Sequence, residues 1–310
     1  MRKRLIFLIC IIILIIITFI IIFFNFKINE NFEVNREWIN KDEIMMDEIL
    51  PLLYEMPNVN NLMENYNFIN RIHPMHKREL GLGYSIINLE RYGGYTSIFI
   101  TVLVDENINS FDSIITIRIN NDIIKLFENK FSKSSIQNSE VYYGKNYLYH
   151  IIKHKDMDLY EAFINNFNEY FQINKNIYIP DEIKNEYRLM TEPFNENVFG
   201  YRIGFDGIIP RERIALNKIL ELNDKNILLG IIASPNPEGR LYAIEGLSKN
   251  NINNIINDEE YLNILNKIIE LNCRIRVGRY CVISFIDINS IDDIQCLFNE
   301  IRVNIDTPIE

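Results

Sequence analysis

The chain has 310 residues, a formal net charge of −10 and an apolar fraction of 48%. This length and apolar content are enough for one large packed domain or two modest ones. The acidic balance argues against nucleic acid as a partner, because nucleic-acid-binding proteins present basic surfaces to the phosphate backbone. It also disfavours adsorption on anionic lipid surfaces.

An apolar run occupies the N-terminal end of the sequence. Leu5 to Phe24 is uncharged, and Arg2, Lys3 and Arg4 precede it. A helix rises about 1.5 Å per residue, so this run spans roughly 30 Å, the thickness of a bilayer core. We therefore predict a transmembrane helix that contacts the lipid bilayer. Since only Lys27 follows closely, the positive-inside rule predicts a cytoplasmic N-terminus and an extracytoplasmic body, in a bacterial periplasm or at a cell surface.

A cleaved signal peptide is the alternative for this segment, because it shares the basic start. Such a peptide has an apolar core of about 7 to 15 residues and a small-residue cleavage site. The run here is longer, and residues 25–29 after it contain no small-x-small triplet. These differences favour a retained anchor.

The sequence divides into four predicted segments. Residues 1–27 form the cytoplasmic tip and anchor, residues 28–40 a polar linker, residues 41–185 an α+β domain and residues 186–310 a mainly helical domain. The predicted fold class is therefore α+β, with an N-terminal transmembrane helix, a small and mostly antiparallel sheet with helices, and then a short α-helical layer.

Helical and strand patterns alternate through the middle of the chain. Asn40 followed by Glu43 is typical of a capping box at a helix start. Gly93 and Gly94 separate two runs rich in β-branched and aromatic residues, which is typical of a β-hairpin. Together these patterns predict helices over about residues 41–56, 59–72, 121–131 and 158–171, and strands over about residues 83–91, 95–104, 113–119 and 141–152.

An internal repeat begins near Pro210, where the pattern becomes helical. Pro210-Arg-Glu-Arg213 and Pro237-Glu-Gly-Arg240 each have a leucine seven residues after the arginine. Proline at the first helical position needs no amide partner, so both segments predict one type of helix used twice. Gly278 to Val282 offers a possible third copy, and its β-branched run is equally typical of a strand.

The second copy resembles a known repeat family. The run Pro235-Asn-Pro-Glu-Gly-Arg-Leu-Tyr-Ala-Ile-Glu-Gly-Leu247 is similar to the second helix of short HEAT-like repeats, whose pattern runs through proline, glutamate, arginine, alanine and leucine. That family builds α-solenoids that bind other proteins and usually lack catalytic residues. The resemblance, over about residues 205–272, implies a short HEAT-like layer and a protein partner. Gly239 and Gly246 depart from the pattern, since glycine costs about 1 kcal/mol of helix propensity.

Aromatic residues provide the candidate contact surface, because such residues anchor protein interfaces. Tyr142, Tyr147 and Tyr149 recur along the strand predicted over residues 141–152. Arg240 and Tyr242, in the second copy of the repeat, complete the set of possible interaction residues. No catalytic, cofactor-binding or metal-binding residue is assigned.

Histidine pairs are the alternative site. His73 and His76 flank a proline without an accompanying cysteine or acidic cluster, which disfavours a metal site. His150 and His154 would align on a helix, but on the predicted strand they lie about 13 Å apart. Asp105 ends another predicted strand, where catalytic carboxylates often sit. The sequence contains no HExxH, paired CxxC or dinucleotide fingerprint, so we predict no cofactor.

Three functions are therefore open. The leading hypothesis is a single-pass membrane-anchored protein whose outer body acts through protein contact, as an interaction or scaffold module of the cell envelope. The alternative is a membrane-tethered hydrolase or metal-dependent enzyme that uses His150, His154 and Asp105. A small-ligand receptor that uses the open face of the sheet is a third hypothesis, without a supporting motif.

Overall fold

The computed structural model describes residues 34–70, 77–127, 139–173, 177–203, 206–249, 258–279 and 282–306. The helices are α2 (Arg36–Leu53), α3 (Val59–Asn65), η1 (Asn121–Ile123), α5 (Met157–Phe171), η2 (Asp181–Ile183), α6 (Lys184–Thr191), α7 (Arg211–Glu221), α8 (Lys225–Ile232), α9 (Pro237–Lys249), α10 (Asp258–Glu270) and α11 (Ile291–Asp306). The strands are β1 (Ile69–Asn70), β2 (Arg78–Gly81), β3 (Tyr84–Tyr92), β4 (Thr96–Val104), β5 (Ser110–Asn120), β6 (Ser139–Tyr143), β7 (Tyr147–Lys155), β8 (Arg274–Arg279) and β9 (Val282–Asp287).

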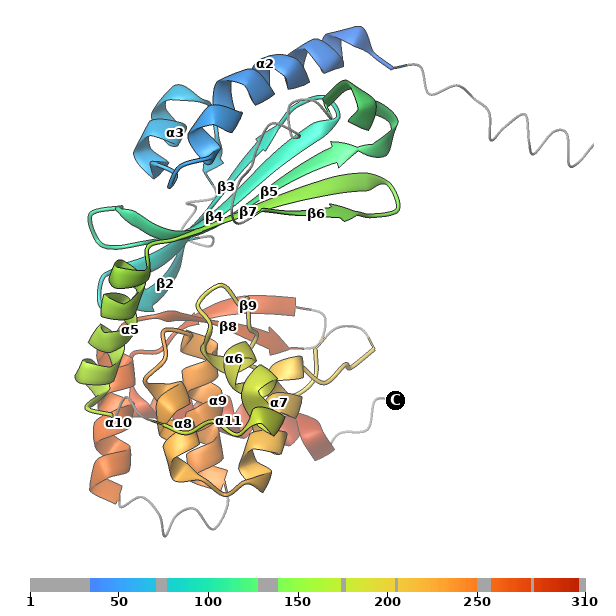
Figure 1. Cartoon of the computed structure of the whole chain (residues 1–310). Helices are drawn as coiled ribbons and strands as arrows, with labels where there is room; N and C mark the ends of the chain where they lie inside the picture. The colour runs from blue at the N-terminus through green and yellow to red at the C-terminus, as the bar shows by residue number, and fades with distance from the viewer. Residues whose placement is uncertain are drawn as a thin grey trace, which may run out of the picture.

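A seven-stranded sheet forms the N-terminal half (Figure 1). Its strands follow the order β1-β3-β4-β5-β7-β6, and β2 pairs with β3 beside β1. Every pairing between these described strands is antiparallel. Strand β3 is therefore flanked on one side by two short strands, whereas β6 forms the opposite edge of the sheet.

One face of the sheet packs against α2 and α3, which lie across it in Figure 1. Successive side chains of a strand point to opposite faces. In β4, Ile98, Ile100 and Val102 point to the helix-covered face and are at most 1% exposed. Met46 and Ile49 of α2 are fully buried in the same apolar core. This core closes one face of the sheet, so the chemistry of the other face decides what the sheet can bind.

Helix α2 is held on the sheet by a buried carboxylate. Asp42 accepts hydrogen bonds from the backbone N–H groups of Gly94 and Tyr95, both at 2.8 Å, and from the Thr96 hydroxyl at 2.6 Å. A Cβ atom on Gly93 would lie 2.0 Å from an Asp42 oxygen. The double glycine of the β3–β4 hairpin is therefore needed for the close approach of α2, as well as for the turn.

The C-terminal half packs its helices around α9. All residues from Pro237 to Leu247 are buried. A Cβ on Gly239 would lie 1.9 Å from the backbone oxygen of Met190, so glycine is needed where α9 passes the end of α6. Strand β8 pairs with β9 in a two-stranded sheet, and the segment at Phe199 runs beside β8.

Helix α5 leads from the sheet into the helical half (Figure 1). Asp156 caps its first turn by accepting from the Leu159 N–H at 3.1 Å. Phe163, Phe167 and Phe171 recur every four residues, so they share one face of the helix and are all buried in the second apolar core. This core also contains residues of β2, β3 and α9, so it joins the two halves of the molecule.

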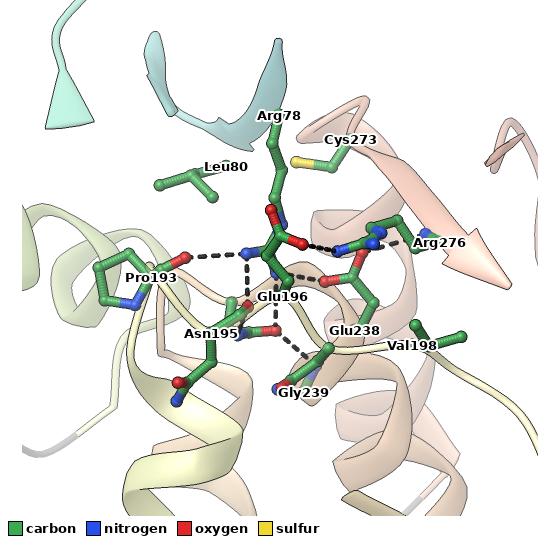
Figure 2. Close-up of polar contacts among 12 residues, drawn as sticks. Arg78, Leu80, Pro193, Asn195, Glu196, Val198, Glu238, Gly239, Cys273 and Arg276 are labelled. Carbon is green, nitrogen blue, oxygen red and sulfur yellow. Dashed lines mark hydrogen bonds and ion pairs between the residues drawn. The ribbon is translucent and has the colours of Figure 1, made fainter. Parts of the chain in front are cut away.

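A buried ion pair fixes β2 to α9. Arg78 of β2 pairs with Glu238 in the first turn of α9, and their side chains are 8% and 0% exposed. The same guanidinium donates to the backbone oxygens of Pro193 at 2.8 Å and Asn195 at 2.6 Å (Figure 2). The charge of Arg78 is thus matched by a carboxylate and by backbone acceptors.

The second oxygen of Glu238 accepts from the backbone N–H of Arg276 in β8 at 3.0 Å (Figure 2). Two residues further along α9, Arg240 donates to the backbone oxygen of Leu80 in β2 at 2.8 Å. One turn of α9 therefore holds β2 and β8 together.

The structure corrects two predicted elements in the sheet. The strand predicted over residues 141–152 is the hairpin β6–β7, because the chain turns where the Gly144 N–H donates to the Tyr147 oxygen at 2.8 Å. The helix predicted over residues 59–72 ends at Asn65, and Ile69–Asn70 then pairs with β3. Strand β2 has no counterpart among the predicted elements.

In the C-terminal half, α7 and α9 lie where the two copies of the repeat predict helices. In the possible third copy over residues 278–282, Gly278 and Arg279 belong instead to β8, and Val282 belongs to β9. Its β-branched run therefore reflects strand pairing.

The predicted fold class is wrong. It combined a transmembrane helix, a small sheet and a helical layer, whereas the described chain has a seven-stranded sheet and a second strand pair within its helical half. Across the described ranges, no helix combines the length and the apolar character that crossing a membrane requires. The predicted span, Leu5 to Phe24, lies outside the described residues. The envelope location and the HEAT-like resemblance stay predictions.

We predict that Arg78→Met lowers the free energy of unfolding by about 3 to 5 kcal/mol, because it leaves Glu238 as an unpaired buried charge. The matched control is Arg188→Met, which removes an exposed pair with Glu192 and should cost less than about 1 kcal/mol. Urea unfolding of the full chain measures both. Equal losses in the two variants would contradict the role assigned to the buried pair.

Candidate functional site

The face of the sheet opposite α2 and α3 carries a group of aromatic side chains around one arginine. The register places them together: Ser97 of β4 lies opposite both Tyr92 and Arg118, and Tyr149 lies opposite both Arg118 and Tyr142. We call this group the open-face cluster, and it consists of Tyr92 (β3), Phe99 (β4), Arg118 (β5), Tyr142 (β6), Tyr147 and Tyr149 (β7).

The open-face cluster lies at the exposed end of this face. Tyr92 is 49% exposed and Tyr142 is 63% exposed, and the other members are half-buried. At the other end of the same face, Ile86 and Leu103 are buried in the core that contains α5 and α9. The helical half therefore covers one end of the face and leaves the cluster accessible.

Arg118 is held at the centre of the cluster by two rings. Its guanidinium carbon lies 5.3 Å from the ring centroid of Phe99 and 4.8 Å from that of Tyr147. One of its nitrogens donates to the Ser97 hydroxyl at 3.2 Å. A guanidinium has five N–H donors in a planar fork that matches a carboxylate. Cation–π contact with the two rings holds the guanidinium on the open face, where the half-buried side chain stays within reach of an incoming acceptor.

The aromatic members also pack against one another. The ring centroids of Tyr142 and Tyr149 lie 6.0 Å apart, those of Tyr147 and Tyr149 6.4 Å apart, and those of Tyr92 and Phe99 5.9 Å apart. Such contacts restrict the side chains before any partner arrives. Tyrosine offers a large contact area at a small entropic cost, which suits a recognition surface.

Three of the predicted interaction residues, Tyr142, Tyr147 and Tyr149, belong to this cluster. Tyr92, Phe99 and Arg118 were missed, because they lie on other strands and their proximity depends on the register. The alternation of polar and apolar residues along β5 is the signal that could have placed Arg118 on the face opposite the core.

Arg240 and Tyr242, the other predicted interaction residues, lie inside the helical half and are 1% and 0% exposed. The Arg240 guanidinium carbon lies 4.8 Å from the Phe167 ring centroid. The Tyr242 hydroxyl donates to the backbone oxygen of Val198 at 2.9 Å, and burial raises the pKa of Tyr242 well above its ordinary value. These contacts favour a structural role for both side chains.

The residues of the alternative enzyme hypothesis lie in separate surroundings. His150 is 2% exposed on the helix-covered face, where burial lowers its pKa. A ring nitrogen of His154 lies 2.8 Å from the backbone oxygen of Leu53. Asp105 accepts from the Asn109 side chain at 2.9 Å within its own loop. Within the part of the chain that the structure describes, no three His, Cys, Asp or Glu side chains are placed to hold a metal ion.

His73 and His76, the other histidine pair, lie outside the described residues. The structure therefore leaves the prediction for this pair untested.

A buried carboxylate marks the covered end of the open face. Asp112 is 4% exposed, and the Lys155 ammonium lies 3.1 Å from one of its oxygens. Lys155 also lies 3.5 Å from the ring centroid of Tyr160. Burial raises the pKa of Asp112 above its ordinary value, although Lys155 opposes this shift. Burial and the charge of Asp112 raise the pKa of Tyr160 to about 12.

Comparisons with known proteins do not assign a family: no family model matches the chain, and neither a curated protein nor a solved structure matches it.

We predict that the free energy of unfolding of Asp112→Asn, relative to that of the wild type, increases as the pH rises from 4 to 7. The raised pKa means that folded Asp112 keeps its proton to a higher pH than unfolded Asp112 does. Wild-type stability therefore falls as the pH rises from the unfolded to the folded pKa, whereas the variant lacks this loss. Urea unfolding at both pH values measures the difference.

Asp181→Asn is the control with the opposite sign. Lys184 lowers the pKa of Asp181, so its contribution is present above the unfolded pKa and is lost as the pH falls. The relative stability of this variant should therefore be nearly constant between pH 4 and pH 7 and should rise only as the pH falls below the ordinary carboxyl pKa of 3.8. A stability difference for Asp112→Asn that does not change with pH would contradict the assignment of a raised pKa.

Proposed function

We propose that this protein binds another protein through the open-face cluster and that it acts through this contact. The observation that carries the proposal is Arg118, held between the Phe99 and Tyr147 rings on a partly exposed aromatic surface. Interfaces concentrate their binding energy in tyrosine, tryptophan and arginine, so this composition supports a recognition surface.

The partner's chemistry follows from Arg118. A guanidinium binds a carboxylate through parallel N–H donors more strongly than it binds a neutral acceptor. The surrounding tyrosine rings favour apolar side chains beside that carboxylate. We therefore propose a partner segment with an exposed Asp or Glu side chain, or a C-terminal carboxylate, flanked by apolar residues.

The arrangement of the sheet supports this use of the face. The core under α2 and α3 holds the strands, so the cluster is not needed to complete that core. The six side chains come from five neighbouring strands of one sheet, and rigid elements position a binding site more precisely than loops do.

The test is site-specific photo-crosslinking of the full chain in the cells that produce it. A benzophenone amino acid replaces Tyr149 in one variant and Tyr178, which is 80% exposed outside the cluster, in the control. We expect a discrete protein adduct from position 149, absent from position 178, and reduced at least about tenfold by Arg118→Gln, since a hot-spot arginine contributes 2 kcal/mol or more.

Two outcomes would contradict the proposal. Equal adducts from positions 149 and 178 would indicate non-specific capture. An adduct from position 149 that survives Arg118→Gln unchanged would show that the guanidinium does not recognise the partner.

A further inference from the structure

Strand β6 is an exposed edge with an apolar character. Among the described strands it pairs with β7 alone, so its other side lacks a pairing strand there. Val141, Tyr142 and Tyr143 are 53%, 63% and 69% exposed. Natural edge strands are usually protected by charge, proline or a bulge. Glu140 is the single charged residue of β6, so this edge is weakly protected against pairing with another strand.

The turn beside β6 shows which backbone groups point outward. The Gly144 N–H donates to the Tyr147 oxygen at 2.8 Å, which makes these two residues a hydrogen-bonded pair. Hydrogen-bonded and non-bonded pairs alternate along an antiparallel ladder. Tyr142 therefore bonds to β7, whereas Val141 and Tyr143 direct their N–H and C=O groups to the outer edge.

We infer that a second copy of this chain occupies the edge, with two β6 strands paired antiparallel about a two-fold axis. The register places Tyr142 opposite Tyr142 of the second copy and Val141 opposite Tyr143 of that copy. Val141 and Tyr143 then exchange the outward hydrogen bonds.

The side chains are self-complementary in this register. Aromatic pairs and aromatic–β-branched pairs both stabilise antiparallel strands. Glu140 lies opposite Gly144 of the second copy, so no like charges oppose each other. The contact is isologous and closes as a dimer, as two-fold interfaces do. A register shifted by two residues toward the start of the strand would place Glu140 opposite Tyr142 and lose this match.

Dimer formation extends the proposed recognition surface. Tyr142 is the member of the open-face cluster nearest the edge, so two clusters meet across the paired β6 strands. The inference does not rest on the proposed function, because it uses the backbone edge of β6 whether or not the open face binds another protein.

Cysteine crosslinking of the full chain tests the register. The parent carries Cys10→Ser, Cys281→Ser and Cys296→Ser and keeps Cys273, which is buried with a raised thiol pKa. Tyr142→Cys then places two thiols at a non-hydrogen-bonded pair, where the Cα atoms lie about 4.5 Å apart and within reach of a disulfide.

Glu140→Cys is the matched control on the same face of the same strand. In the inferred register its two thiols lie about 13 Å apart along the strands, too far for a disulfide. Under mild oxidation we expect at least about tenfold more covalent dimer from Tyr142→Cys than from Glu140→Cys. Equal yields from the two variants, or no dimer from Tyr142→Cys, would overturn the inference.

Val141→Pro provides a second measurement. It removes an outward N–H that the β6–β7 ladder does not use, and proline is tolerated at such edge positions. Added to Tyr142→Cys, it should reduce the dimer to the level of the Glu140→Cys control while the circular dichroism spectrum is unchanged. A dimer that persists in this double variant would also overturn the inference. If the proline disturbs the fold, the comparison of Tyr142→Cys with Glu140→Cys still tests the register by itself.

Discussion

The buried ion pair between Arg78 and Glu238 sets the relation between the sheet and the helical half. An unpaired charge in this interior would cost several kcal/mol, so the side chains are stable there only together and with their backbone partners. Strand β2 is one of the shortest strands of the sheet, so it makes few backbone hydrogen bonds to β3. The hydrogen bonds of Arg78 to the helical half therefore help to hold β2 in place. The same pair places the helical half at one end of the open face, where Ile86 and Leu103 are buried.

This placement divides the open face into two parts with different chemistry. At the covered end, the buried Asp112 carboxylate lies beside Lys155 and Tyr160, and desolvation raises the pKa values of Asp112 and Tyr160. At the exposed end, Arg118 has ring neighbours and solvent. A buried charge beside a packed core affects the stability of the fold, whereas the half-buried guanidinium of Arg118, beside aromatic rings, is suited to contact with another molecule. The exposed end of the open face is therefore the part suited to recognition.

Local signals predicted much of the fold, and long-range register limited the rest. The Gly93-Gly94 hairpin and the helix after Asp156 were predictable because turn and cap residues act on their own neighbours. The turn at Gly144 was missed, since the aromatic run on both sides reads as one continuous strand. Arg240 was assigned to a contact surface from its place in the repeat, yet the backbone oxygens of Leu80 in β2 and of Ser234 accept its N–H groups and make its burial possible. Tyr142, Tyr147 and Tyr149 were predictable as a tyrosine-rich strand, but Arg118 joins them only through the pairing of β5 with β7.

Hydroxyl-radical footprinting of the unmodified full chain tests the central claim most directly. Tyr92 reports on the open-face cluster at a strand distant from the β6 edge, and Tyr178 reports on exposed surface outside it. The account predicts that labelling of Tyr92 falls in the native cell extract relative to the isolated chain, while labelling of Tyr178 is unchanged. Equal labelling of Tyr92 in the extract and in the isolated chain would contradict the claim that a partner protein covers this face.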